Sequence, residues 1–286
     1  MQWLDAIVQG VLLGGLYAQY ALGMALMFGV MRIINIAHGD VMVLLAFGAI
    51  LLQRASDWNP FVCLVVLLPA AALLGYALQR LLLNRVVRAD PLASLIATFG
   101  LSIAIQNGLL VAFTADPRAL PANGLESVSV EVGALHLGVL PLLILATALA
   151  LTAGVHALLA RSAFGRALRA SAADVDAAAM TGVNPKSIYA QATAVAVAIL
   201  AIAAVFQALR VTVSPSDGPS QLLFAFESVI IGGMGSIWGA FAGAIALGVA
   251  QSIGARFDVA WGQLAGHFLF LAMLAARPQG FFALRR

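Results

Sequence analysis

Long stretches of this chain consist almost entirely of hydrocarbon side chains, and no other feature limits its fold as strongly. Two of these stretches read FVCLVVLLPAAALLGYAL and PLLILATALALTAGVHALLA. A helix needs about 20 apolar residues to cross the hydrocarbon core of a bilayer. The strands of a membrane-spanning barrel alternate apolar and polar residues, which these stretches do not. The sequence therefore predicts an all-α, polytopic membrane protein.

The composition supports this fold class and bounds the number of passes. Only 9% of the 286 residues are charged, whereas a soluble domain has about 25%, so polar groups cannot cover a water-facing surface. The predicted apolar segments are 7–30, 39–53, 61–83, 92–113, 138–158, 188–210, 222–235, 238–254 and 262–276. Because some of them are short, we expect about eight or nine passes with broken or half-helices, in one transmembrane domain spanning 1–286.

The distribution of basic residues predicts which side faces the cytoplasm. Ten of the fifteen basic residues end the third segment, lie in the connection 161–187 or lie near the C-terminus: Arg80, Arg85, Arg88, Arg161, Arg166, Arg169, Lys186, Arg277, Arg285 and Arg286. The positive-inside rule places these on the cytoplasmic side. The longest connection on the other side, 114–137, contains the alternating SVSVEVGALHLG. That pattern is typical either of a small hairpin over the mouth of a path or of a plain connector.

The inner connection 161–187 has the features of a short helix rather than a bare link. Asp174 is placed to cap a helix N-terminus, and Gly182 suits a left-handed helix end. Between them lie mainly Ala and other small residues, which let another surface approach closely. Arg166 and Arg169 supply charged contacts nearby. We expect either a docking element for a partner or a plain loop whose basic residues only fix orientation.

A polar interruption, NIAHGD, separates the first two apolar segments. It brings Asn35, His38, Gly39 and Asp40 together in a chain that is otherwise mostly hydrocarbon. Ionisable groups within membrane spans are costly and usually face a cavity. The alternatives are a boundary that caps a helix beginning at Val41, or a gate lining a translocation path. Polar groups in the fourth segment, Gln106 among them, suit the same path or hydrogen bonds between helices.

A second interruption lies in the other half of the chain. Gly232, Gly233 and Gly235 break an apolar run shortly after Glu227. Unwound backbone at membrane depth is tolerated where it is buried in protein or lines a water-filled cavity. One break in each half of a transporter is the pattern that points to a path near the midplane. A GxxxG motif follows at 239–243 and predicts close helix packing.

Several stretches, in order along nearly the whole chain, resemble LivH-type permeases of branched-chain amino acid ABC importers. The stretches are GGLYAQYALGMALMFGVMRIINIAHGDVMVLLAF, LIATFGLSIAIQN, FGRALRASAADVDAAAMTGVN, AFESVIIGGMGSIWGAFAGAIALGVAQS and ARPQGFF. The resemblance implies a permease subunit in a bacterial inner membrane, without a cofactor. It also implies a LivM-type second permease or a second copy, two cytoplasmic ABC ATPases and a periplasmic solute-binding protein.

The resemblance also assigns residues. An ATPase groove would hold the coupling segment, in which the matching residues are Gly165, Arg166, Arg169, Ala170, Asp174 and Gly182. NIAHGD and GGMGS would flank the solute path. Expected solutes are branched-chain or other hydrophobic amino acids, or a related amide, urea or aromatic acid. Glu227 departs from the family pattern, and it either tunes the path toward a cationic or amide solute or pairs with the partner permease.

The chain lacks the motifs of an enzyme that works alone. Its only lysine, Lys186, lies in NPKS, which is not the phosphate-binding Gly-Lys-[Ser/Thr] sequence. No His-Glu-x-x-His metal motif occurs, and the single Cys63 excludes an internal disulfide or a cysteine metal cluster. The net charge of +3 does not indicate nucleic-acid binding. The alternative function is a stand-alone channel or ion-coupled carrier for a small polar solute.

Overall fold

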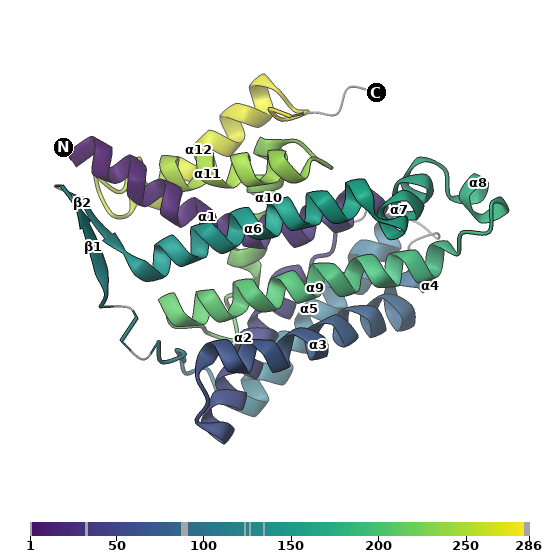
Figure 1. The fold of residues 1–286 in the computed structure, drawn as a ribbon, viewed down its shortest axis with the longest axis horizontal. Coiled ribbons are helices and arrows are strands. Elements are labelled where there is room, and N and C mark those ends of the chain that lie inside the picture. Colours follow the sequence, from purple (N-terminus) through teal and green to yellow (C-terminus); the bar gives the residue numbers. More distant parts are fainter. Residues whose placement is uncertain are drawn as a thin grey trace. The chain divides into compact units, whose positions relative to one another are not determined.

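A computed structural model describes residues 2–31, 34–86, 91–122, 124–125, 127–133 and 135–282. The described part is mostly helical, which confirms the all-α prediction, and each predicted apolar segment lies mainly in a helix, although 222–235 extends past the helix that ends at Gly232 (Figure 1). The elements are α1 (Gln2–Met31), α2 (His38–Ser56), α3 (Pro60–Leu78), a π-helical turn η1 (Gln79–Leu83), α4 (Asn84–Val86), α5 (Pro91–Phe113), β1 (Ser129–Val132), β2 (Leu135–Gly138), α6 (Val139–Arg161), α7 (Ala163–Ala173), α8 (Val175–Met180), α9 (Pro185–Arg210), α10 (Gly218–Gly232), α11 (Ile237–Gly254) and α12 (Trp261–Ala276).

Length and composition decide which of these helices can cross a bilayer. Among the described residues, seven helical stretches are long and apolar enough, and they include α2 and α11, which the sequence left doubtful. Helix α12 is apolar but shorter, and α10 has 15 residues. Eight or nine passes therefore remain a prediction that depends on these two helices.

The chain folds into two compact units. Unit 1 comprises Met1–Ala25, Pro121–Ala153 and Leu223–Arg286, and unit 2 comprises Leu26–Leu120 and Gly154–Leu222. Helices α1, α6 and α10 contribute residues to both units. The prediction of a single transmembrane domain stays a prediction.

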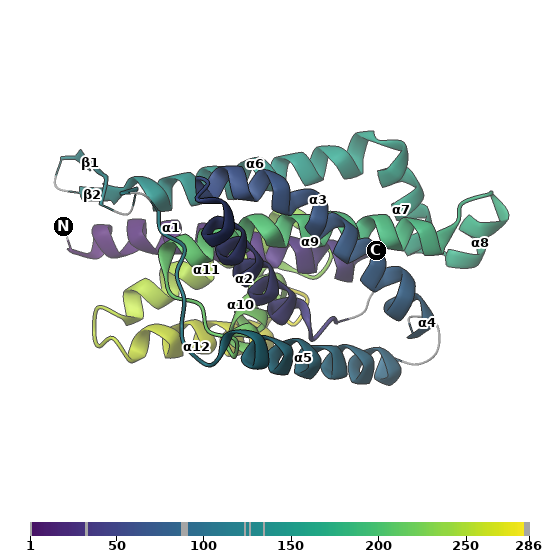
Figure 2. The same cartoon turned by 90° about the horizontal axis from the view of Figure 1, so that it is seen from below.

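In unit 2, α3 packs along α9 (Figure 2). The contact is close because Gly75 of α3 lies directly against Thr193 and Val197 of α9. Both helices begin with the same signal, an Asn cap followed by Pro. The side chain of Asn59 accepts from the Phe61 N–H at 2.9 Å, and that of Asn184 accepts from the Ser187 N–H at 3.3 Å.

Unit 1 contains the N-terminal part of α1 and the pair α11 and α12. Gly10 and Gly14 of α1 face Gly248 of α11, so the two backbones approach without intervening side chains. The connection 114–137 forms the predicted hairpin, in which β1 pairs antiparallel with β2. The side chain of Gln9 donates to the His136 carbonyl at 3.2 Å and ties the hairpin to α1. A position over the mouth of a path stays a prediction.

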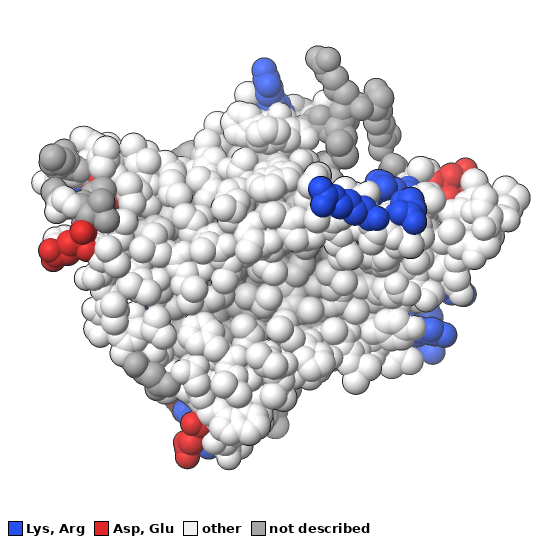
Figure 3. All heavy atoms as spheres, viewed as in Figure 1, with Lys and Arg blue, Asp and Glu red and all other residues white. Residues whose placement is uncertain are grey.

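Charged side chains of unit 2 gather at its ends. Figure 3 shows Lys and Arg around α7 and beside the far end of α3, and acidic groups near the turn that joins α2 to α3. The exposed basic residues of η1, α4, α6 and α7 are Arg80, Arg85, Arg161, Arg166 and Arg169. Arg88, Arg285 and Arg286 lie outside the described residues. The basic end is the one that the positive-inside rule assigns to the cytoplasm.

Candidate functional site

The polar interruption NIAHGD forms the entry to α2. The Asn35 side chain accepts from the Ala37 N–H at 3.1 Å, and helix α2 begins at His38 rather than at Val41. The prediction of a cap at Val41 is therefore wrong, because Asp40 already lies inside the first turn of the helix. An acidic side chain there interacts favourably with the positive end of the helix dipole. His38 and Asp40 are both buried.

The carboxylate of Asp40 faces α5. It accepts from the Gln106 amide nitrogen at 2.9 Å and from the Ser102 hydroxyl, and the Gln106 nitrogen lies 3.3 Å from the Ser102 oxygen. Gln106 lies about 22 Å along a helix about 34 Å long, at 1.5 Å per residue. The cluster thus lies well inside the span rather than at its edge. This satisfies the sequence prediction that Gln106 makes a hydrogen bond between helices, whereas its role in a path stays a prediction.

Two glycines bring the start of α2 against the start of α10. A Cβ atom on Gly39 would overlap the carbonyl oxygen of Gly218, and a Cβ atom on Gly218 would overlap the Asp40 carboxylate. Gly218 is the first residue of α10, so the carboxylate lies at the positive end of that helix's dipole. A solute anion that approached this helix end would meet a carboxylate already in place.

We expect Gln106→Leu to lower the free energy of unfolding by about 1–3 kcal/mol, because it removes a donor from the buried Asp40 carboxylate. The neighbouring Asn107 is exposed and bonds only within its own helix in the described contacts, so Asn107→Leu is the matched control. Thermal melting of the purified protein in detergent measures both. Equal melting temperatures for the two variants would show that the Asp40 contact contributes little.

The glycine break is a turn between two helices. Helix α10 ends at Gly232. The next glycines, Gly233 and Gly235, adopt left-handed φ angles of 107° and 89°. The Ser236 hydroxyl oxygen then caps α11 by accepting from the Gly239 N–H at 3.0 Å. The GxxxG motif packs as predicted, because Gly239 lies directly against Gly232. Two carbonyl groups at the end of α10 have partners in the described chain, while the prediction that this break lines a path stays a prediction. The N–H groups of Phe281 and Phe282 donate to the Ile231 and Gly232 carbonyls, at 3.0 and 2.9 Å.

The C-terminal ARPQGFF motif therefore has a structural explanation that the sequence did not reveal. Gly280 has a φ of 79° and lies against the backbone of Gly233, with no room for a side chain. This contact lets the following residues reach the end of α10. A path role for Gly232, Gly233 and Gly235 stays a prediction.

Glu227 is buried in unit 1 and has a partner in its own chain. One carboxylate oxygen, Oε1, lies 2.6 Å from His267 Nδ1 of α12. The residue Glu227 as a whole is 1% exposed to solvent. A salt bridge to another permease is therefore not needed to explain this residue, whereas tuning of a path by Glu227 stays a prediction.

The inner connection forms α7 and α8, of which α8 is the short helix that the sequence predicts between Asp174 and Gly182, whereas α7 was not predicted. The Asp174 carboxylate accepts from the Asp176 and Ala177 N–H groups at 2.9 and 3.0 Å, which confirms the predicted N-cap. Gly182 has a φ of 87°, which confirms the predicted left-handed end. Helix α8 exposes Ala177, Ala179 and Met180, and Met180 is 84% exposed.

The two arginines of α7 have acceptors in their own chain, while their contact with an ATPase stays a prediction. Arg169 donates to the Leu159 carbonyl and Arg166 to the Arg161 carbonyl, at the end of α6. Gly165 lies against the backbone of Leu159, while Ala170 is exposed. Both guanidinium groups thus close the C-terminus of their own chain's helix, where cations are favoured. Each guanidinium group therefore already has a hydrogen-bond acceptor within the chain.

Three residues that contact Asp40 or Glu227 escaped the sequence interpretation: Ser102, Gly218 and His267. The signal of Ser102 and His267 is weak because each is a single polar residue in an apolar run, and Gly218 lies in the polar stretch SPSDGPSQ. Only the fold brings them next to Asp40 or Glu227. A polar residue inside an apolar span is the one hint that the sequence offers.

Comparisons with known proteins agree on one family. A family model described as "Branched-chain amino acid transport system / permease component" matches residues 6–276. The permease protein BraD of Pseudomonas aeruginosa, from a high-affinity branched-chain amino acid transport system, is 29% identical over 97% of this chain and 95% of its own. LivH of Escherichia coli K12, named as the same kind of permease, is 27% identical over 98% of this chain and 95% of its own. Among solved structures, PsaBC from Streptococcus pneumoniae in complex with Fab contains a chain with a TM-score of 0.48 and 11% identity, covering 95% and 90%.

Proposed function

The chain belongs to the branched-chain amino acid transport permease family, and from this premise we propose that it forms the solute path of a binding-protein-dependent ABC importer. The solute is a branched-chain or other small amino acid or a related polar compound. Separate cytoplasmic ATPases supply the energy, a second permease completes the path, and a periplasmic protein delivers the solute. The chain has no ATPase site of its own, and its place is the bacterial inner membrane.

One observation carries this proposal, namely the shape of the inner segment. Helix α8 is capped at both ends, yet it presents exposed Ala and Met side chains on the basic side of unit 2. A loop that only links α6 to α9 needs neither the caps nor the extra length. A stable helix with an exposed apolar residue suits a groove on an ATPase, with Met180 as the residue that enters it.

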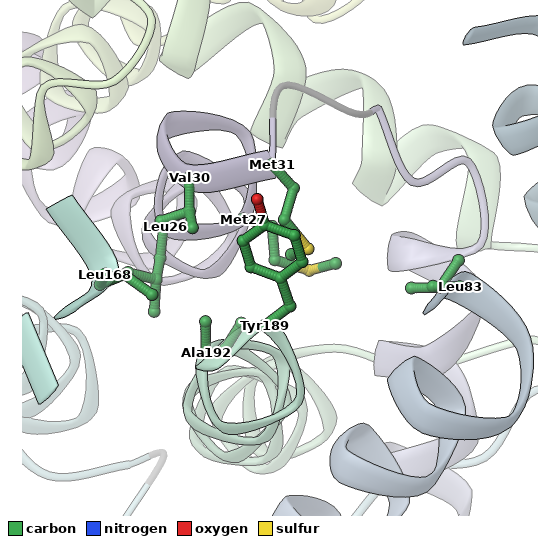
Figure 4. Close-up of a cluster of buried hydrophobic side chains, with 9 residues drawn as sticks. Leu26, Met27, Val30, Met31, Leu83, Leu168, Tyr189 and Ala192 are labelled. Atoms are coloured by element: carbon green, nitrogen blue, oxygen red, sulfur yellow. The ribbon is translucent and has the colours of Figure 1, made fainter. Parts of the chain in front are cut away.

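The base of this segment is packed so that it can transmit movement. Leu168 of α7 belongs to the same buried cluster as Leu26 and Val30, near the end of α1 (Figure 4). On the other side of this cluster lie Tyr189 and Ala192 of α9. The end of α1 leads directly into the NIAHGD segment. A displacement of α7 therefore acts on the residues that precede α2 through packed side chains.

The polar clusters supply the groups that meet the solute in this proposal. Asn35, His38, Gly39, Asp40 and Gln106 belong to unit 2. Glu227 and the glycine turn belong to unit 1. Buried ionisable groups within spans are the expected signature of a solute path.

Reconstitution tests the proposal. The chain is placed in proteoliposomes with the second permease, the ATPases and the binding protein, and uptake of labelled L-leucine is followed with and without ATP. Uptake that needs ATP and every added subunit supports the proposal. Flux through the chain alone would instead identify a stand-alone channel or carrier.

We expect Arg169→Glu to lower the free energy of unfolding by about 1–3 kcal/mol, because the carboxylate cannot donate to the Leu159 carbonyl. Displacement of α7 should also reduce co-purification of the ATPases. Arg169→Lys keeps a cationic donor and serves as the control. If Arg169→Glu melts like the parent protein and still loses its ATPases, the arginine acts in docking rather than in closing α6.

A further inference from the structure

Five side chains from four helices form a polar and aromatic cluster in unit 1, in which all but the partly exposed His267 are buried: Tyr17, Phe224, Glu227, Gln251 and His267. The Tyr17 hydroxyl donates to Gln251 Oε1 at 2.7 Å. The rings of Tyr17 and Phe224 stack at 4.8 Å, and the Phe224 and His267 rings are parallel at 6.4 Å. Together with the contact from His267 to Glu227, these interactions hold each member of the cluster in place.

Two polar atoms of this cluster have no hydrogen-bond partner among the residues that the structure describes. They are Glu227 Oε2 and Gln251 Nε2, and both are buried. Their residues are 1% and 5% exposed. Buried polar atoms in native proteins nearly always have a partner, because leaving one unpaired is costly. The two atoms are also complementary, since the carboxylate oxygen accepts a hydrogen bond and the amide nitrogen donates one.

The two unpaired groups lie beside consecutive residues of α12. A Cβ atom on Gly266 would come within 2.9 Å of Gln251 Nε2, and the next residue, His267, holds Glu227. The only described residues of α12 that are buried are Gly262, Gly266 and Met273. Helix α12 thus contributes Gly266 and His267 to the wall of the cluster, next to the two unpaired atoms.

We propose that Glu227 and Gln251 bind the transported solute directly, an inference that rests on the proposed transport function. Glu227 Oε2 accepts from an N–H group of the solute, and Gln251 Nε2 donates to a carboxylate or carbonyl oxygen. The site therefore selects a solute that has both a hydrogen-bond donor and an acceptor, such as a zwitterionic α-amino acid. The Tyr17 and Phe224 rings offer an apolar surface to its side chain.

Two substitutions exchange donor and acceptor at the unpaired atoms, and each also changes the charge of its side chain. Glu227→Gln keeps Oε1 as the acceptor from His267 and replaces Oε2 by a donor. Gln251→Glu keeps Oε1 as the acceptor from Tyr17 and replaces Nε2 by an acceptor. The neighbouring contacts are preserved in both variants, so a change in ligand preference reports on the free atoms.

The first experiment uses the assembled complex of both permeases and the ATPases in nanodiscs, without the binding protein. The probes are L-leucine, 4-methylpentanoate, which lacks the amino group, and 3-methylbutylamine, which lacks the carboxylate. L-leucine should raise the melting temperature of the parent complex, and the other two should not. Both variants should lose the response to L-leucine, and Gln251→Glu should gain a response to the amine.

Uptake with the binding protein added should fall at least 10-fold in both variants, while the ATPases still co-purify.

Hydrogen exchange on the parent complex needs no variant, and L-leucine should slow it in 223–232 and 261–268. ATP-driven uptake by the parent complex with no change in either variant would overturn the inference and leave the proposed function intact. The inference would also be overturned if L-leucine did not slow hydrogen exchange in these segments of an active parent complex. No ATP-driven uptake by the parent complex would refute the proposed function itself.

Discussion

Gly39→Ala should leave little folded protein, although it adds a single methyl group. The new Cβ atom would overlap the carbonyl oxygen of Gly218, which belongs to backbone and cannot rotate away as a side chain does. Overpacking of a core costs about 1–3 kcal/mol, and a clash with backbone lies at or above the upper end of that range. We therefore expect the free energy of unfolding to fall by about 3 kcal/mol or more, with loss of uptake.

The same substitution on the same helix provides the control. A Cβ atom on Gly48 would lie 3.6 Å from a methyl group of Leu67, which is ordinary contact. Replacing Gly by Ala within a helix is favourable by about 0.5–1 kcal/mol. Gly48→Ala should therefore melt at the parent temperature or above it. Size-exclusion chromatography and thermal melting of both variants measure the contrast, and similar behaviour of the two would show that α2 and α10 are not in tight contact.

Met180→Lys should abolish coupling while the chain still folds. Met180 is 84% exposed at the end of α8, so its replacement removes no core contact. A cation at a helix C-terminus is favourable, which protects the helix itself. In an apolar groove of an ATPase, however, an unpaired ammonium group is costly to bury. We expect ATP-driven uptake to fall at least 10-fold, which corresponds to about 1.4 kcal/mol or more of lost docking energy.

Two further variants make this result specific. Met180→Leu keeps an apolar side chain of similar volume and should retain uptake. Val130→Lys places the same charge on the exposed hairpin, which is not part of the inner segment, and should also retain uptake. ATPase co-purification, measured in parallel, should fail only for Met180→Lys. Normal uptake by that variant would remove Met180 from the docking surface.

Local signals in the sequence were sufficient where they concern neighbouring residues. Asp174 and Gly182 mark the ends of α8 because an acidic N-cap and a left-handed glycine act within one turn of the chain. The hairpin follows from the alternation in 129–138. The sequence did not show that Arg169 donates to the Leu159 carbonyl, because only the packing of α7 against α6 brings the two groups together.

By itself, the sequence determined that the chain is a helical membrane protein, since charged residues are too few to cover a surface in water. It also determined the inner segment and the family, because both depend on residue order along the chain. Only the tertiary structure decided the partners of Asp40 and Glu227. Gln106 is 66 positions from Asp40, and His267 is 40 positions from Glu227. Such pairs form through helix packing, and no local pattern of apolar residues records which polar atoms packing brings together.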